Sequence, residues 1–115
     1  MHSEIINLTD RSIALVVNAY AIDLPPSALP AIVDRRDDVV GYCEFRGGRI
    51  PIIEHTARRV LNLPKPDPYK IYIASPEVAA AARQYFDRSD VYATGRLVHD
   101  GQGKVLGVGA LLRVR

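Results

Sequence analysis

Short runs of apolar and β-branched residues, separated by turn-forming residues, recur along this chain of 115 residues. Residues 12–17 and 20–24 are the first two runs, and the two small residues between them predict a β-hairpin. Pro25 and Pro26 follow directly, and proline cannot donate a hydrogen bond to a β-ladder. The second strand of this hairpin is therefore expected to end at residue 24.

A second hairpin is expected at residues 39–45 and 49–53, where two strongly apolar arms flank an Arg-Gly-Gly turn. Glycine supplies the positive φ angle that tight hairpin turns require. Pro51 lies inside the second arm, which assigns this arm to a sheet edge or to a bulge.

The C-terminal part of the chain predicts a third hairpin and one further strand. Residues 91–99 and 104–114 flank the turn sequence Asp-Gly-Gln-Gly, and residues 69–74 alternate between apolar and polar side chains. Gly107 and Gly109 weaken the return strand of the hairpin or allow another segment to pack closely against it.

Two segments have the apolar spacing of short helices. Residues 54–63 (EHTARRVLNL) place apolar side chains on one face of an amphipathic helix. A second helix is expected from Pro76 to Phe86, because Ser75 can accept hydrogen bonds from first-turn amides and proline suits the first helical position. Its core-facing stripe is expected to consist of Val78, Ala82, Tyr85 and Phe86.

The segment between the first two hairpins has weaker signals. Residues 28–33 are apolar but contain Pro30, and they are expected to form a short extended or one-turn helical piece. The mixed charges of residues 34–38 (DRRDD) predict a solvated loop. Three hairpins and two short helices together predict a mainly β domain built as a barrel or as a pair of barrels.

Length and composition favour one domain, at residues 1–115, because a chain of this size with 48% hydrophobic residues supports a single core. The 15 basic and 13 acidic residues are interspersed and give a net charge of +2, so no single-sign tail is present. Arginine outnumbers lysine in the middle third, which leaves a folded basic patch open.

Few residues are candidates for metal or cofactor chemistry. Cys43 is the one cysteine, which excludes an internal disulfide and a multi-cysteine zinc site. His2, His55 and His99 lack partners at metal-ligand spacing, and no glycine-rich loop precedes a helix as in nucleotide sites. No cofactor and no metal are expected.

The sequence gives no sign of export or of membrane insertion. The N-terminal residues lack the charged start, apolar region and cleavage site of a signal peptide, and no apolar run reaches membrane-spanning length. We expect a cytoplasmic protein without membrane insertion.

Cys43 and His55 are the candidates for a nucleophile and its base, since such partners are often distant in sequence. Cys43, however, lies in an apolar strand, where cysteine usually behaves as a small buried hydrophobe. Glu44 and Glu54 are two carboxylates near one hairpin, a position that solvent-facing charges commonly occupy. We expect no enzymatic activity.

The central stretch, residues 41–54, resembles the CheW-like family of chemotaxis coupling proteins. That family typically carries a glycine, four mostly apolar residues, Arg-Gly, and an apolar strand with a proline, two aliphatic residues, an aspartate and a leucine. Here the sequence GYCEFRGGRIPIIE, which begins at Gly41, matches this spacing without a gap. Residues 19–29 and 91–101 are similar to the family's first and closing hairpins, so the resemblance spans most of the chain.

The chain departs from the family pattern at several positions. Glu54 stands where aspartate is usual, His55 replaces the leucine, and Glu44 takes a position that is often asparagine. Residues 106–109 lack an acidic residue, and the chain is shorter than a typical member. It therefore resembles a divergent, short member of the family, and these departures put coupling to a kinase in question.

The resemblance implies a fold of two small, packed, five-stranded SH3-like β-barrels with short helices. It also implies a non-catalytic signalling adaptor in chemotaxis. Members link the cytoplasmic tip of a chemoreceptor to the regulatory domain of a histidine kinase. The receptor binds in an apolar groove between the barrels, and the kinase binds at a barrel end.

We expect the partner-binding residues to cluster around the Arg-Gly turn. An arginine at a hairpin turn offers a fork of donors for carboxylates or carbonyls, and apolar neighbours add desolvated contact area. The alternatives without a binding role are that the turn arginine is simply solvated and that the proline protects an edge strand from aggregation. The predicted partner-binding residues are Arg46, Gly47, Gly41, Ile50, Pro51 and Ile52.

A competing interpretation is a small basic β-barrel that binds single-stranded nucleic acid. Such barrels combine a basic groove with stacking aromatic side chains, and the central arginines lie near Tyr42 and Phe45. The interleaved acidic residues and the small number of aromatics make nucleic acid the less favoured partner.

Overall fold

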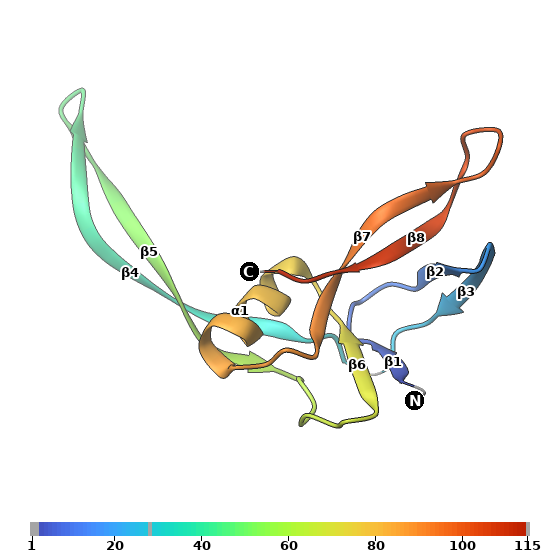
Figure 1. Cartoon of the computed structure of the whole chain (residues 1–115). Helices are drawn as coiled ribbons and strands as arrows, with labels where there is room; N and C mark the ends of the chain where they lie inside the picture. Colours follow the sequence, from blue (N-terminus) through green and yellow to red (C-terminus); the bar gives the residue numbers. More distant parts are fainter. Residues whose placement is uncertain (1–2, 28, 115) are drawn as a thin grey trace.

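The computed structural model describes residues 3–27 and 29–114, so the expectations for His2 and Ala28 lie outside the described residues. Within these ranges the chain is mainly β (Figure 1). The elements are β1 (Glu4–Asn7), β2 (Ile13–Val17), β3 (Tyr20–Leu24), β4 (Ile32–Phe45), β5 (Gly48–Leu61), β6 (Lys70–Ile73), α1 (Pro76–Phe86), β7 (Val91–His99) and β8 (Val105–Leu112).

Six strands form one mixed, barrel-like sheet in the order β1-β6-β7-β8-β2-β3, while β4 and β5 form a separate two-stranded ribbon (Figure 1). β6 pairs with β1 and β7 in parallel, and the β7–β8 and β2–β3 hairpins meet through a single parallel pair, Leu15 with Val108. The prediction of a mainly β, barrel-like domain is confirmed. The two-barrel arrangement is not confirmed by these strands.

Several elements with strong local signals lie where the sequence predicts them. The hairpins at residues 13–24 and 91–112, the strand at 70–73 and the helix at 76–86 are confirmed. Strand β1, which the sequence analysis did not predict, gains its ladder by parallel pairing with β6, from Glu4 with Lys70 to Asn7 with Ile73.

The predicted helix at residues 54–63 is wrong, because residues 48–61 form strand β5. The register pairs Asp34 with Arg59 and Arg35 with Ala57, which leaves Arg58 as an extra, bulged residue. A bulge shifts the two-residue alternation by one position. The apolar residues beyond it therefore imitate helical spacing.

The predicted loop at residues 34–38 is also wrong, because β4 runs from Ile32 to Phe45. In the segment 28–33, for which an extended or one-turn helical piece was expected, residues 32–33 are extended as the start of β4 and residues 29–31 are not helical. In a two-stranded ribbon both faces meet water along part of its length, so charged side chains fit a strand that no second layer covers. The hairpin expected at residues 39–53 is real, but it is only the outer part of a ribbon with 14-residue strands.

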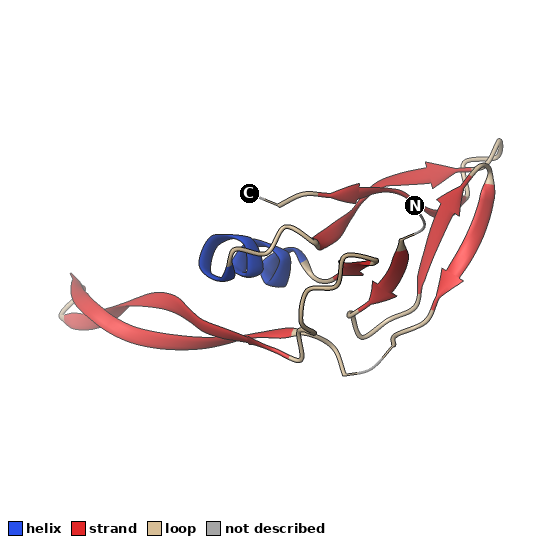
Figure 2. Ribbon diagram, turned by 60° about the horizontal axis from the view of Figure 1, so that its bottom comes forward, coloured by secondary structure: helices blue, strands red, loops and turns tan. Residues whose placement is uncertain are grey.

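Helix α1 packs between the sheet and the base of the ribbon (Figure 2), in contact with β7 and with β4 and β5. Its alanine-rich face lets the strands approach closely, and Val78 and Ala82 are buried as expected. Tyr85 and Phe86, which were expected on the same core face, are exposed. The core that α1 completes consists of Leu8, Ala31, Tyr72, Ala74, Val78, Ala79, Ala82 and Val91.

Removal of the helix cap tests the local origin of α1. The Ser75 hydroxyl accepts a hydrogen bond from the Val78 amide at 3.2 Å, which satisfies one first-turn donor. Ser75→Ala is expected to lower the free energy of unfolding by about 1 kcal/mol. Urea denaturation of both proteins measures the loss. Equal midpoints would show that the cap contributes nothing.

Candidate functional site

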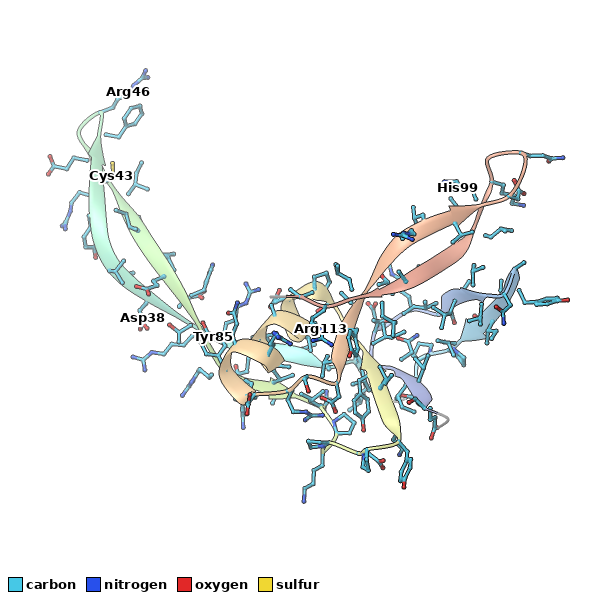
Figure 3. The ribbon with its side chains drawn as sticks, in the orientation of Figure 1. Asp38, Cys43, Arg46, Tyr85, His99 and Arg113 are labelled. Carbon is cyan, nitrogen blue, oxygen red and sulfur yellow. The ribbon has the colours of Figure 1, made fainter. Side chains whose placement is uncertain are left out.

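The turn of the β4–β5 ribbon consists of Arg46 and Gly47, whose φ angles are +49° and +78°. Two central residues with positive φ are typical of a type I′ turn, which matches the twist of the flanking strands. Gly48 was expected in the turn but is the first residue of β5. Arg46 is exposed at the far end of the ribbon (Figure 3), with its guanidinium 5.2 Å from the centre of the Phe45 ring.

One face of the ribbon near this turn is apolar, and we call it the outer face. Cross-strand partners point to the same side of a ribbon, and the register pairs Gly41 with Ile52, Cys43 with Ile50 and Phe45 with Gly48. Phe45, Ile50 and Ile52 are 59%, 52% and 49% exposed. The outer face therefore consists of Gly41, Cys43, Phe45, Ile50 and Ile52 and holds three of the six predicted partner-binding residues.

The opposite side of the same ribbon, the inner face, is also apolar. Its apolar members are Val39, Tyr42, Pro51 and Ile53, because Val39 pairs with Ile53 and Tyr42 pairs with Pro51, and the charged pair of Glu44 with Arg49 lies on the same face next to the turn. Val39 and Ile53 are 53% and 51% exposed. The Arg49 guanidinium lies 4.0 Å from the centre of the Tyr42 ring on this side, a cation–π contact, and Tyr42 is 55% exposed.

The two faces belong to opposite sides of the molecule because the base of the ribbon is anchored to α1. Arg35 and His55 lie on the inner face, and Arg35 forms an ion pair with Glu77 of α1. Val33 and Val60 pair across the base and pack against the core. At the ribbon base the inner face is therefore the side toward the helix, and the outer face is the side away from it.

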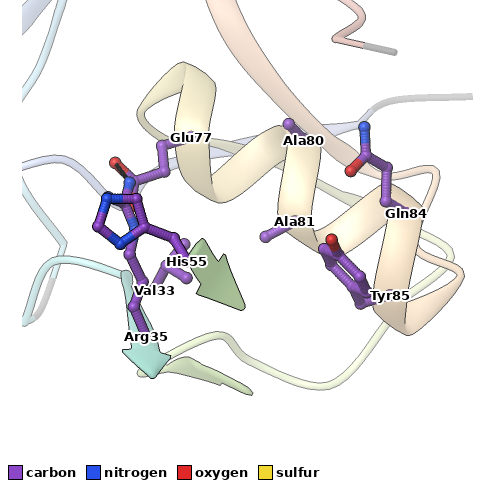
Figure 4. Close-up of a pocket in the computed structure, with 8 residues that line it drawn as sticks. All are labelled: Val33, Arg35, His55, Glu77, Ala80, Ala81, Gln84 and Tyr85. Carbon is purple, nitrogen blue, oxygen red and sulfur yellow. Dashed lines mark ion pairs between the residues drawn. The ribbon is translucent and has the colours of Figure 1, made fainter. Parts of the chain in front are cut away.

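A hollow of about 290 Å³ lies between the ribbon base and α1, and it is lined by Val33, Arg35, His55, Glu77, Ala80, Ala81, Gln84 and Tyr85 (Figure 4). Its charged groups already have partners, since Arg35 pairs with Glu77 and His55 pairs with Asp37. The Arg35–Glu77 pair joins the ribbon to the helix, and the His55–Asp37 pair lies within the ribbon. They leave no free charge in the hollow to hold a ligand.

The structure does not bring Cys43 and His55 together. His55 lies opposite Asp37, six residues before Cys43 along β4, so roughly 17–20 Å of strand separates them. They also point to opposite faces of the ribbon. The expectation that Cys43 is buried is wrong, because its side chain is exposed near the turn (Figure 3).

The described residues contain neither a cluster of potential metal ligands nor a membrane-spanning helix. Nowhere in residues 3–27 and 29–114 do three His, Cys, Asp or Glu side chains converge as a metal site requires. With 11 residues α1 is too short to cross a bilayer, and the same ranges hold no longer helix.

Arg46, Gly47, Ile50 and Ile52 were predicted as partner-binding residues, and Phe45 was named only as a stacking aromatic for nucleic acid. The exposure of Val39 and Ile53 was missed. The alternation of apolar side chains on both sides of the turn was the available signal. It shows which residues share a face, but it does not reveal that neither face is covered.

No protein-family model, no curated protein and no solved structure matches this chain.

Proposed function

We propose that the protein is a non-catalytic interaction module that binds a protein partner through the outer face of its ribbon and through Arg46. The observation that carries this proposal is the half-exposed apolar patch of Phe45, Ile50 and Ile52 beside a guanidinium at the ribbon's end. Aromatic, aliphatic and arginine side chains in one exposed cluster are typical of protein-binding surfaces.

The chemistry of the patch supports a peptide or helical partner. The aliphatic side chains of the outer face gain free energy when a partner removes them from water. Among the described residues Arg46 forms no ion pair, so its donors remain available to a carboxylate or carbonyl group. Gly41 and Gly47 leave the backbone uncovered, and Gly47 also supplies the turn conformation.

The resemblance to chemotaxis coupling proteins supplies the expected partners, the cytoplasmic tip of a chemoreceptor and the regulatory domain of a histidine kinase, and hence a cytoplasmic location. The adaptor role does not depend on the two-barrel arrangement, because the proposed surface lies on the ribbon alone. Pro51 lies on the inner face, so it acts in this proposal by keeping the strand edge free of aggregation and not by contact.

A binding measurement tests the proposal. Titration of the protein with a helical hairpin peptide from a chemoreceptor tip is expected to shift the amide resonances of residues 41–52. Ile52→Asp is expected to weaken binding more than tenfold, since it places a charge in the apolar contact, and Arg46→Glu should do the same by reversing the donor charge. The kinase regulatory domain is titrated in parallel.

Arg58→Glu provides the matched control, because it reverses an exposed charge of the same ribbon far from the turn. It should leave the affinity unchanged, and circular dichroism should show all three variants folded. If neither the receptor peptide nor the kinase domain binds the unaltered protein, the adaptor proposal is wrong.

The pairs Arg46–Phe45 and Arg49–Tyr42 favour single-stranded nucleic acid as the second candidate, because both bring a cation onto an aromatic ring. Much of the remaining positive charge of the ribbon is neutralised, since Arg36 pairs with Asp38 and Arg59 with Asp34. Titration of the protein with a labelled single-stranded oligonucleotide at two salt concentrations distinguishes the nucleic-acid candidate from the adaptor proposal. Tight binding that weakens steeply with salt would replace the adaptor proposal.

A further inference from the structure

The chain exposes far more surface than a compact monomer of its size. Its accessible surface is 8346 Å², whereas surface scaling for 12.7 kDa gives about 6,200 Å². Its radius of gyration is 18.2 Å, against about 13 Å for a compact domain of this length. The excess of about 2,100 Å² falls within the roughly 1,000–2,500 Å² that each subunit of a permanent dimer buries.

The ribbon contributes to this excess through its inner face. A two-stranded ribbon is marginally stable in water unless a further layer covers at least one face. Beyond the ribbon base, Val39, Tyr42 and Ile53 are each more than half exposed. In a single chain, these three apolar side chains therefore have no second layer of structure packed against them.

The six-stranded sheet also has apolar side chains that a single chain leaves exposed. Ile22, Leu15, Val108 and Leu97 are in register across the four neighbouring strands β3, β2, β8 and β7, and so they form one apolar row on one face. The ends of this row remain open, with Ile22 48% and Leu97 59% exposed. We call these four residues the sheet row.

The inner face and the sheet row cannot meet within one chain. The ion pair between Arg35 and Glu77 and the packing of Val33 and Val60 fix the ribbon base against α1. From there the ribbon and the β7–β8 hairpin extend in different directions (Figures 1 and 2), and the molecule spans 59 Å. A second copy offers both surfaces at once, and a two-fold axis makes the two contacts equivalent.

We propose that the protein is a homodimer in which each ribbon packs its inner face on the sheet row of the other copy. The exchange covers the inner face of a ribbon that is marginally stable alone, and it covers the exposed ends of the sheet row at Ile22 and Leu97. The two-fold axis repeats both contacts. The outer face and Arg46 remain free in this dimer. Self-association and partner binding thus use opposite sides of one ribbon.

Two neighbouring isoleucines test the dimer, because Ile53 belongs to the inner face and Ile52 to the outer face, with almost equal exposure of 51% and 49%. Light scattering at micromolar concentration is expected to give twice the mass of one chain for the unaltered protein and for Ile52→Asp. Ile53→Asp and Leu97→Asp are each expected to give the mass of one chain. A monomeric unaltered protein would overturn the proposal.

Cross-linking tests the arrangement without relying on variants that reduce stability. In a Cys43→Ser background, Ile53→Cys in one preparation is mixed with Leu97→Cys in another, unfolded, refolded together and oxidised. A disulfide-linked heterodimer is expected. Ser89→Cys, on the exposed turn after α1, replaces Leu97→Cys as the control and should not cross-link. A dimer that links Ile53→Cys only to its own kind would overturn the exchanged arrangement.

The outcome is independent of the proposed function. A monomer that still binds the receptor peptide would refute only the dimer. A dimer that cross-links as described but binds neither the peptide nor the kinase domain would refute only the adaptor role.

Discussion

Gly107→Ala is expected to lower the free energy of unfolding by about 3 kcal/mol, because the added methyl group has no space. A Cβ atom at this position would lie 2.4 Å from the carbonyl oxygen of Ala14 and 3.0 Å from its carbonyl carbon. These are backbone atoms of β2, so no side chain can rotate away to relieve the contact. The strands would have to separate.

The site of this contact makes separation costly. Strands β2 and β8 are joined by the single pair Leu15 with Val108, next to Gly107. The methyl group would therefore open the junction between the two hairpins and break the sheet row. Urea denaturation followed by circular dichroism measures the loss.

Gly101→Ala is the matched control, because a Cβ atom there meets nothing within 4 Å. This variant should unfold within about 0.5 kcal/mol of the unaltered protein. If the two alanine variants unfold at the same urea concentration, β8 does not approach β2 as closely as described.

Elements whose signals are local were predictable from the sequence. The hairpin at residues 91–112 carries its turn sequence between two β-branched runs, and α1 carries Ser75 and Pro76 at its start. Gly107 was expected either to weaken the return strand or to allow another segment to pack closely, and the structure shows close packing of β2 against it. In each case turn or cap geometry gives a short stretch of sequence a recognisable preference for one local conformation.

The ribbon was not predictable over its full length, because its register depends on pairing between distant residues. Arg58 and Val40 are extra residues opposite a continuous partner strand, and each shifts the alternation by one position. When the sequence is interpreted from local patterns alone, the shift at Arg58 resembles the spacing of apolar residues in a helix. The charged run at 34–38 is extended because β5 pairs with it, not because of its own preference.

The candidate site was predictable in part, for the same reason. The Arg-Gly turn located Arg46 and Gly47 correctly, since positive φ angles have a strong sequence signal. The exposure of Phe45, Val39 and Ile53 follows from the absence of a second layer in a single chain, which no local pattern encodes. The bare faces are the physical basis of both proposals.

Asn7→Leu is expected to lower the free energy of unfolding by about 3 kcal/mol or more, because it removes a buried hydrogen-bonding centre. Asn7 is 2% exposed. Its Nδ2 group donates to the carbonyl oxygens of Arg11 and Leu24, each at 2.8 Å, and its Oδ1 accepts from the Thr9 amide at 2.9 Å. Leucine fills a similar volume but leaves these groups without partners.

Asn7→Asp separates the hydrogen-bonding explanation from one based on volume, since it keeps the shape and removes both donors. The new carboxylate would be buried and would face the Arg11 and Leu24 carbonyl oxygens, so its pKa in the folded state should rise above about 3.9. A raised pKa stabilises the fold at low pH, and this contribution is lost as the pH rises through the folded-state value. The stability of Asn7→Asp relative to the unaltered protein should therefore improve from pH 7 to pH 4. A difference that does not change with pH would show that Asn7 acts through packing alone.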